Sequence, residues 1–348
     1  MSAPFLSVVI PTYNRCESLR RTLEGLSRQE GFPGERLEVV VVSDGATDRT
    51  DAMLAEYART APFALRPIRQ DNAGPARARN RGVQEATGSV IVFLDDDVEP
   101  MPGFLAAHAR RHEQDEKVVL IGPQSPAPDR RGAEPAWIVW EHEMLQRQYV
   151  ALESGEWTAG PQHFYTGNAS LRRAHLLAVG GFDETFKRQE DVELAYRVRR
   201  DCGVYFAFVG DAAALHRPSR TFDSWLRTPY AYGQLDIVRV QRGDVSWRVI
   251  WISYQRRSRM TRFLVDLALP RPSLSPPICG LLRGGSQLAF RLPGAFRRAA
   301  IGALSTLYNL RYMEGARDSL GSWQTLSEMV RLPLDDPRVS PVASKPLI

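Results

Sequence analysis

The sequence SVIVFLDDDVEP at residues 89–100 joins a run of apolar, mostly β-branched side chains to three aspartates. The apolar part, residues 90–94, predicts a strand with both faces covered, and residues 37–43, LEVVVVS, have the same character. Such strands are typical of a mostly parallel sheet with helices on both faces and right-handed crossovers. The first expectation is therefore an α/β fold.

Strand and helix signals alternate over the first hundred residues. Further strands are expected at 6–11 and 65–70, and helices at 17–29, 47–60 and 75–86, with turn or capping residues between them. In such a sheet, ligands bind beyond the carboxyl ends of the strands. Polar residues follow all four predicted strands at that edge: Thr12, Tyr13 and Asn14, then Asp44, then Asn72 to Gly74, and finally Asp95, Asp96 and Asp97.

The three adjacent aspartates indicate a cation site. Neighbouring carboxylates repel one another unless a cation or solvent compensates their charge. The D-x-D spacing of Asp95 and Asp97 lets a hard ion such as Mg²⁺ or Mn²⁺ be held while other positions stay open to diphosphate oxygens. An acidic turn with solvated side chains is the alternative. At a ligand-binding edge we favour the metal.

Residues 72–82, NAGPARARNRG, predict a glycine turn followed by a helix with arginines in its first turns. A helix N-terminus with nearby guanidinium groups suits a phosphate. Arg77, Arg79 and Arg81 are spaced two apart, so they cannot share one helix face, and at most one or two can reach a site. A solvated arginine face is the competing interpretation.

Residues 180–194, GGFDETFKRQEDVEL, contain a second acidic motif. Gly180 and Gly181 are expected to end one helix, and Glu190 and Asp191 fall in the first turn of the next. The helix dipole favours acids there, so capping alone explains one of them. An aspartate at a helix start beside a cleft can also accept a proton from a hydroxyl group.

Asp44 and His216 can each be interpreted either as a functional residue or as a structural one. Asp44 could accept hydrogen bonds from a base or a ribose, or it could form an Asx turn with Gly45. His216 ends a short apolar run, and a lone histidine is more often a satisfied structural residue than a ligand.

Four motifs, taken in order, resemble those of family 2 glycosyltransferases with the GT-A fold. They are SVVIPTYNR, VVSDGATD, NAGPARARNRG with FLDDDVEP, and GGFDETFKRQEDVEL, and they cover about residues 5–220. The resemblance implies a Rossmann-like sheet and a nucleotide-sugar site. The implied donor-binding residues are Pro11, Thr12, Tyr13, Asp44, Gly74, Arg79, Asp95 and Asp96. The implied ligands for Mn²⁺ or Mg²⁺ are Asp97, Asp95 and His216, with Asp97 favoured as the direct ligand; Asp191 resembles the catalytic base, and Glu190 is its competitor.

The reaction that the resemblance implies is a single displacement with inversion, from a nucleotide diphosphate sugar, UDP-linked by preference, to an acceptor hydroxyl. The acceptor would be a glycan, a lipid-linked compound or a small molecule in cell-envelope or polysaccharide biosynthesis. The sequence has no Q-x-x-R-W signature, which indicates a non-processive enzyme. A sugar nucleotidyltransferase is one alternative, although PTYNR stands where those enzymes usually have a glycine-rich loop. A non-catalytic nucleotide-sugar-binding protein is the other, and the intact acids argue against it.

Composition limits the compartment. A chain of 348 residues with 43% hydrophobic residues can bury a large core. The three scattered cysteines lack zinc or redox spacing, which favours a reducing compartment. The first residues lack the features of a signal or transit peptide, and no apolar stretch is long enough for a membrane span. The expected location is the cytoplasm.

Charge divides the chain into two parts. Residues 1–216 have 25 basic and 31 acidic side chains, and residues 217–348 have 20 and 9, so the net charges are −6 and +11. We expect a catalytic domain over 1–220 and a basic, mainly helical extension over 221–348. Two segments of the extension, RRSRMTR and FRLPGAFRRAAIGALSTLYNL, could lie on an anionic membrane, at its inner face. A helical bundle packed on the catalytic domain is the alternative, and nucleic acid is not an expected partner.

Overall fold

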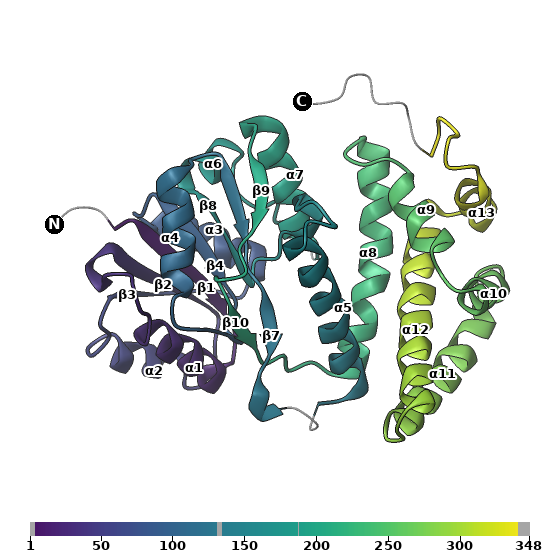
Figure 1. The fold of residues 1–348 in the computed structure, drawn as a ribbon, viewed down its shortest axis with the longest axis horizontal. Coiled ribbons are helices and arrows are strands. Elements are labelled where there is room, and N and C mark those ends of the chain that lie inside the picture. Colours follow the sequence, from purple (N-terminus) through teal and green to yellow (C-terminus); the bar gives the residue numbers. More distant parts are fainter. Residues whose placement is uncertain (1–3, 131–133, 187, 340–348) are drawn as a thin grey trace. The chain divides into compact units, whose positions relative to one another are not determined.

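The computed structural model describes residues 4–130, 134–186 and 188–339. The chain forms two compact units (Figure 1). The first comprises Met1–Glu134 with Glu141–Ser219, and the second comprises Pro135–Trp140 with Arg220–Ile348.

The first unit is built on a seven-stranded sheet in the order β3-β2-β1-β4-β8-β6-β9. β1 pairs in parallel with β2 and β4, β2 with β3, and β6 with β9, whereas β8 runs antiparallel to β4 and β6. The strands are β1 (Leu6–Thr12), β2 (Leu37–Asp44), β3 (Ala64–Gln70), β4 (Val90–Leu94), β6 (Val118–Ile121), β8 (Asn168–Arg172) and β9 (Tyr205–Phe208). The predicted mostly parallel α/β sheet is confirmed.

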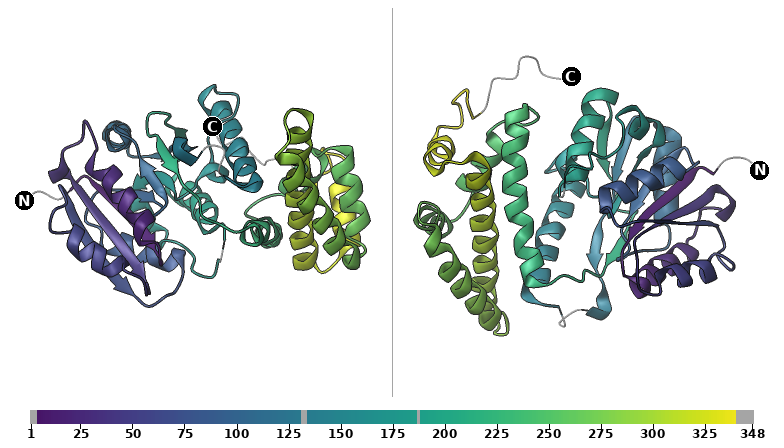
Figure 2. Two further views of the ribbon diagram at one scale, coloured as in Figure 1. Left: turned by 90° about the horizontal axis from the view of Figure 1, so that it is seen from below. Right: turned by 180° about the vertical axis from the view of Figure 1, so that it is seen from behind.

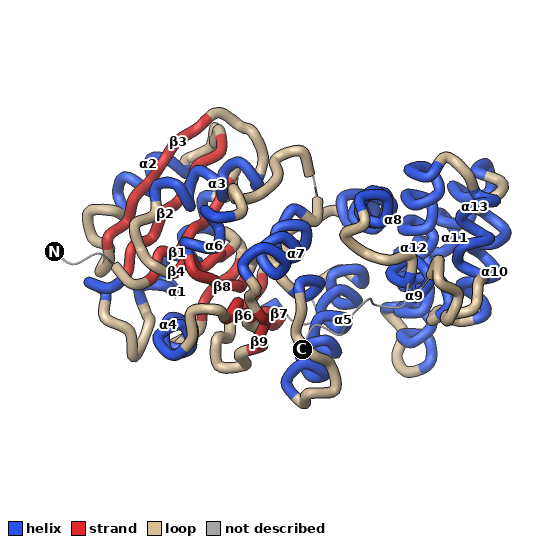
Figure 3. The backbone as a smooth tube through the Cα atoms, turned by 90° about the horizontal axis from the view of Figure 1, so that it is seen from above, coloured by secondary structure: helices blue, strands red, loops and turns tan. Residues whose placement is uncertain are grey.

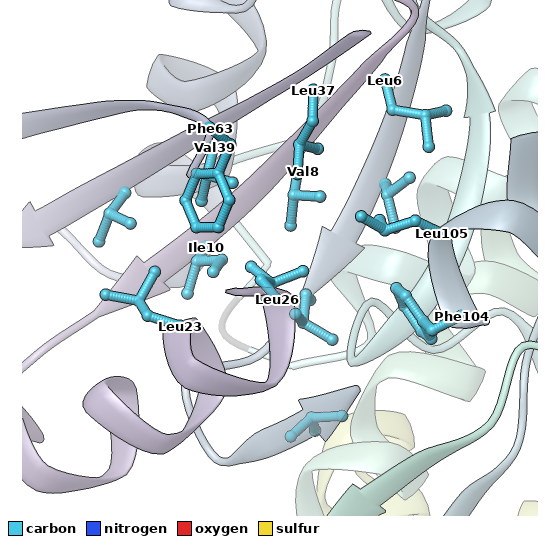
Figure 4. Packing of buried hydrophobic residues seen from close by; sticks show 14 of the residues in the cluster. Leu6, Val8, Ile10, Leu23, Leu26, Leu37, Val39, Phe63, Phe104 and Leu105 are labelled. Carbon is cyan, nitrogen blue, oxygen red and sulfur yellow. The ribbon is translucent and has the colours of Figure 1, made fainter. Parts of the chain in front are cut away.

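Helices cover both faces of this sheet, as the further views in Figure 2 show. One face packs against α1 (Cys16–Ser27), α2 (Thr50–Tyr57) and α4 (Phe104–Gln114), and the other against α3 (Pro75–Glu85), α6 (Arg173–Ala178) and α7 (Glu190–Cys202). Successive strand side chains alternate between the two cores, because a strand has a period of two: Val8 lies in the first and Val9 in the second. Figure 4 shows Leu23 and Leu26 of α1 packed with Val8 and other residues of the first core. Burial on both faces explains the continuous apolar runs.

A second, three-stranded sheet has the order β5-β10-β7. Its strands are β5 (Val98–Pro100), β10 (Ala214–His216) and β7 (Gln124–Pro126). β10 runs antiparallel to β5, with His216 opposite Val98. The chain also forms α5 (Ala136–Glu153) and the short 3₁₀ turns η1 (Gly34–Arg36), η2 (Pro128–Arg130), η3 (Pro161–His163) and η4 (Pro272–Leu274).

The second unit consists, in its described part, of helices and loops (Figure 3). Its helices are α8 (Phe222–Arg242), α9 (Arg248–Gln255), α10 (Arg259–Ala268), α11 (Ser275–Phe290), α12 (Ala295–Leu320) and α13 (Trp323–Arg331). The predicted helical character of the C-terminal region is confirmed. Among the described helices, none has the length and apolar character that a bilayer crossing requires. The proposed domain roles of residues 1–220 and 221–348 stay a prediction.

Helices α8 and α12 approach each other closely at two glycines. A Cβ on Gly233 of α8 would lie 1.9 Å from the carbonyl oxygen of Tyr312, and a Cβ on Gly315 of α12 would lie 1.9 Å from that of Tyr230. Because the nearest atoms belong to the backbone, rotating a side chain could not relieve the clash. The helix pair therefore depends on the absence of a side chain at both positions.

Gly233→Ala should lower the free energy of unfolding of the second unit by at least about 2 kcal/mol, because its methyl group would overlap the backbone of α12. Gly302→Ala is the matched control: it is also in a helix of this unit, but a Cβ there would have no neighbouring atom within 4 Å. That change should raise stability by about 0.5–1 kcal/mol through helix propensity. Urea unfolding followed by circular dichroism measures both, and equal effects would contradict the close crossing.

Candidate active site

The carboxyl ends of β1 and β4 are tied together by Asp96. Thr12, the last residue of β1, donates from Oγ1 to Asp96 Oδ2 over 2.8 Å. Arg15 donates from Nη1 to Asp96 Oδ1 over 3.1 Å and to Asp97 Oδ2 over 2.6 Å. Burial raises the pKa of Asp96 to about 7, although the charge of Arg15 opposes this rise. Both Asp96 oxygens are thus engaged within the protein, and its assignment to donor binding stays a prediction.

Asp97 and His216 lie next to each other because of the small sheet. The backbone N–H of Arg217 donates to the Asp97 carbonyl over 2.9 Å, which continues the β5–β10 pairing. His216 Nε2 then lies 3.6 Å from Asp97 Oδ1. Burial raises the pKa of Asp97, but the interactions with His216 and Arg15 outweigh it and hold that pKa at about 2. Asp97 is therefore a carboxylate throughout the physiological pH range.

This pair fits a divalent metal ion. Mg²⁺ and Mn²⁺ are often bound by one or two protein ligands together with phosphate oxygens of a substrate. His216 Nδ1 is buried and has no hydrogen-bond partner in the part of the chain that the structure describes. The described residues contain no group of three or more His, Cys, Asp or Glu arranged to hold a metal. Of the predicted ligands, Asp97 and His216 lie together, whereas Asp95 is bound to an arginine.

That arginine is Arg79, which bridges two acidic motifs. Its Nη2 donates to Asp95 Oδ1 over 2.8 Å, and its Nη1 donates to Glu190 Oε1 over 2.9 Å. Arg79 is only 5% exposed, whereas Arg77 and Arg81 on the same helix are exposed. The sequence argument that the three arginines cannot share a face agrees with this arrangement. Arg79 connects the end of β4 to the start of α7.

The residue after Arg79 holds the glycine turn that precedes α7. Asn80 Oδ1 accepts from the backbone N–H of Phe182 over 2.8 Å, and Asn80 Nδ2 donates to the Phe182 carbonyl over 2.9 Å. Gly181 has φ of +75°, a conformation that favours glycine, and a Cβ there would lie 2.5 Å from Asn80 Oδ1. The ARN and GGF sequences therefore form one structural element.

Asp191 lies in the first turn of α7, as predicted, and is half-buried. Its Oδ1 accepts from the backbone N–H of Val192 over 2.8 Å. Burial and the neighbouring charge of Glu190 raise the pKa of Asp191 to about 7, against the opposing effect of Arg79. Glu190 is bound to Arg79, so Asp191 is the member of the pair whose carboxylate is less engaged. A carboxyl with this pKa can exchange a proton near neutral pH.

Asp44, at the end of β2, shapes the loop that leads into α3. Its Oδ1 accepts from Gln70 Nε2 over 2.7 Å and from the backbone N–H of Ala73 over 2.9 Å. Its Oδ2 accepts from the backbone N–H of Gly74 over 2.8 Å. These bonds replace the Asx turn with Gly45 that we considered. The site assignments of Asp44 and Gly74 remain predictions.

The end of β1 presents a tyrosine to solvent. Tyr13 is 50% exposed, and Pro11, two residues earlier, is half-buried. The next residue, Asn14, has φ of +53° and accepts at Oδ1 from the backbone N–H of Thr47 over 2.7 Å. The loops after β1 and β2 are thereby joined, which keeps Tyr13 at the strand edge.

Sequence reasoning missed Arg15 and His142. Arg15 follows the PTYN motif, and its pairing with Asp96 and Asp97 depends on the strand order, which no local signal contains. His142 lies edge-on to His216 with ring centroids 5.8 Å apart, and its Nδ1 is 3.3 Å from Glu134 Oε2. The acid-rich sequence WEHE at 140–143 is the one hint that could have drawn attention to it.

Four aromatic side chains within residues 126–165, Trp137, Trp140, Trp157 and Tyr165, could either stack on an acceptor sugar or pack in a core. Trp137 and Trp140 belong to the second unit, where Trp140 packs against Trp225 and donates to Ser305 Oγ over 2.7 Å. Core packing therefore accounts for these two. Trp157 is exposed and stacks on His163, and the Tyr165 hydroxyl donates to Gln148 over 3.3 Å.

The mostly parallel mixed sheet, with helices on both faces and a smaller second sheet, is a GT-A-like fold. Residues 7–179 match the model of the family described as Glycosyl transferase family 2. The chain belongs to this family.

Relatives and solved structures agree with this assignment. The chain is 35% identical over 227 residues to validoxylamine A glucosyltransferase of Streptomyces hygroscopicus subsp. limoneus, which covers 56% of this chain and 48% of that protein. It thus spans about half the length of that curated relative. Its fold is similar to that of mannosyltransferase PcManGT from Pyrobaculum calidifontis, solved with GDP-Man and Mn²⁺, with a TM-score of 0.58, 21% identity and coverage of 93% and 88%. TarS 1-349 of S. aureus, solved with UDP-GlcNAc, gives a TM-score of 0.54 at 18% identity, with coverage of 92% and 93%.

Arg79→Met should lower the free energy of unfolding by about 3–5 kcal/mol at neutral pH, because it leaves Glu190 and Asp95 without their common partner. Arg77→Met, an exposed change on the same helix, is the control and should stay within about 0.5 kcal/mol of the wild type. Denaturant unfolding of both variants measures the difference. Equal stability of the two variants would show that the bridge contributes nothing.

Proposed function

We propose that this chain is an inverting, metal-dependent glycosyltransferase that moves a sugar from a nucleoside diphosphate sugar to an acceptor hydroxyl. The observation that carries the proposal is the position of Asp191: a half-buried carboxyl with a pKa of about 7, next in sequence to Glu190, which Arg79 joins to the end of β4. Family membership supports the same reaction class.

The donor is proposed to lie across the carboxyl ends of β1, β2 and β4. Tyr13 offers an exposed aromatic ring for a nucleobase, and Pro11, Thr12, Asp44 and Gly74 line the neighbouring strand ends and loop. The two similar structures named above were solved with GDP-Man and UDP-GlcNAc, which supports a nucleoside diphosphate sugar. We propose a UDP-linked donor.

Asp97 and His216 are proposed to hold Mn²⁺ or Mg²⁺, with Asp95 and Asp96 on the donor side. When bound, the ion would stabilise the negative charge of the departing diphosphate. Asp97 suits this role because it stays ionised. Arg15 donates to Asp96 and Asp97, so its charge compensates part of their negative charge.

The acceptor hydroxyl is proposed to lose its proton to Asp191. The acceptor oxygen forms a bond to the anomeric carbon while the bond from that carbon to the diphosphate oxygen breaks. The products are the glycoside and a nucleoside diphosphate, and the proton stays on Asp191. One displacement inverts the anomeric centre, so no covalent nucleophile is required. Arg79 keeps Glu190 engaged and leaves the proton transfer to Asp191.

A sugar nucleotidyltransferase and a non-catalytic nucleotide-sugar-binding protein are separated from this proposal by their products. The transferase releases a nucleoside diphosphate, a nucleotidyltransferase releases pyrophosphate, and a binding protein releases neither. Two incubations with Mn²⁺ distinguish all three: with a nucleotide sugar, only the glycosyltransferase releases a nucleoside diphosphate, and with a nucleoside triphosphate plus a sugar 1-phosphate, only the nucleotidyltransferase releases pyrophosphate. The acceptor is proposed only as a hydroxyl compound: a glycan, a lipid-linked sugar or a small molecule.

Asp97→Ala should weaken Mn²⁺-dependent binding of a nucleoside diphosphate by at least about tenfold, because it removes an ionised ligand. Isothermal titration with UDP and with GDP, with and without Mn²⁺, measures this. Asp129→Ala is the control, since Asp129 pairs with Arg217 at the exposed surface. Unchanged diphosphate affinity in excess chelator would contradict a metal-dependent donor site.

Asp191→Asn should lower turnover by roughly 10²–10⁴-fold while donor binding survives, since the amide keeps the size of the side chain but accepts no proton. Glu190→Gln should have a smaller effect. In the wild type, kcat should fall as the pH drops through about 7, because protonation of Asp191 removes the base. Normal turnover of the Asn variant, or retention of the donor's anomeric configuration, would rule out the assignment.

A further inference from the structure

The second unit exposes an unusual group of apolar side chains. Six of the thirteen large apolar side chains that are exposed in the described part of the chain lie within residues 260–296. They are Met260 and Phe263 on α10, Leu281 and Leu288 on α11, and Leu292 and Phe296 at the turn into α12. Exposed apolar side chains gathered in this way mark a surface that contacts something other than water.

These side chains stand on helices that pack against a common neighbour. Leu281 and Leu288 are seven residues apart and so share one face of α11, and Met260 and Phe263 are three apart and share one face of α10. Both helices pack against α12. Figures 1 and 3 show them on one side of α12, with α8 on the other. Leu281 is 77% exposed and Leu288 is 70% exposed, so neither belongs to the core of the unit.

The charge of the same segment is strongly one-sided. Residues 256–300 contain nine arginines, no lysine and one acid, Asp266. Asp266 is already compensated, because it accepts from the Tyr254 hydroxyl and lies 3.2 Å from Arg331. Arg291 and Arg298 are exposed beside Leu292 and Phe296. The surface therefore combines apolar side chains with a positive field.

We propose that this surface, formed by α10, α11 and the start of α12, docks on an anionic lipid bilayer. Leucine and phenylalanine side chains would enter the boundary between headgroups and acyl chains, while the arginines contact lipid phosphates with their guanidinium groups. A nucleic acid would use the arginines but would gain nothing from Leu281 and Leu288. Docking is independent of the proposed sugar transfer, which is measured without lipid, so either can fail alone.

The test uses the full chain and vesicles. The protein should co-sediment with vesicles of phosphatidylcholine and phosphatidylglycerol at low salt, less so at high salt, and far less with phosphatidylcholine alone. Leu281→Ser with Leu288→Ser should weaken this binding at least about tenfold. Val150→Ser with Leu177→Ser, two exposed apolar residues of the first unit, should not change it.

Charge variants complete the design. Arg291→Gln, Arg297→Gln and Arg298→Gln together should weaken vesicle binding at least about tenfold, whereas the same change at Arg59, Arg110 and Arg111 should have little effect. No binding of the wild type at low salt, or equal losses in the matched sets, overturns the proposal. The proposal is also overturned if light scattering shows that the wild type is a dimer, the leucine variant is a monomer, and the wild type does not bind vesicles. Binding to RNA that matches vesicle binding and survives the leucine changes overturns it as well.

Discussion

The site depends on the ion pairs that the buried guanidinium group of Arg79 forms with Asp95 and Glu190. A buried arginine is costly unless its charge is compensated, and Arg79 pairs its two Nη groups with acids from distant parts of the chain, Asp95 and Glu190. The end of β4 and the start of α7 are therefore fixed relative to each other. Asn80 adds hydrogen bonds to the turn before α7. Two consecutive residues of α3 thus bind the segment after β4, the turn at Gly181 and the start of α7.

The acids at this edge show how position gives identical side chains different properties. Asp96 and Asp97 are neighbours and both contact Arg15, yet burial dominates in the first and raises its pKa to about 7, while His216 and Arg15 hold the second near 2. Burial and the negative charge of Glu190 raise the pKa of Asp191 to about 7 as well. Asp97 thus remains charged, as its proposed metal-binding role requires, and Asp191 can take up a proton near neutral pH. Acid and base roles are commonly separated in this way.

Much of the first unit could be predicted from sequence because its signals are local. The apolar runs at 37–43 and 90–94, the glycine turns and the polar residues after the strands all lie within short segments. The bounds of the two apolar runs agree with those of β2 and β4 to within one residue. The choice of Arg79 over Arg77 and Arg81 rested on the family resemblance and agrees with its burial. The role of each residue in donor binding, metal binding or catalysis stays a prediction.

The parts that could not be predicted depend on contacts between distant segments. Arg15 meets Asp97 because β1 and β4 are neighbours in the large sheet, and His142 of α5 lies against His216 of β10 through a contact between a helix and the small sheet. Trp137 and Trp140 pack against Phe222 and Trp225 of the second unit, more than eighty residues further along the chain. Likewise, Gly233 and Gly315 look like helix-weakening residues until α8 and α12 are seen to touch there. A residue that is unfavourable locally can therefore be required by tertiary packing, and no local pattern in the second unit indicates this requirement.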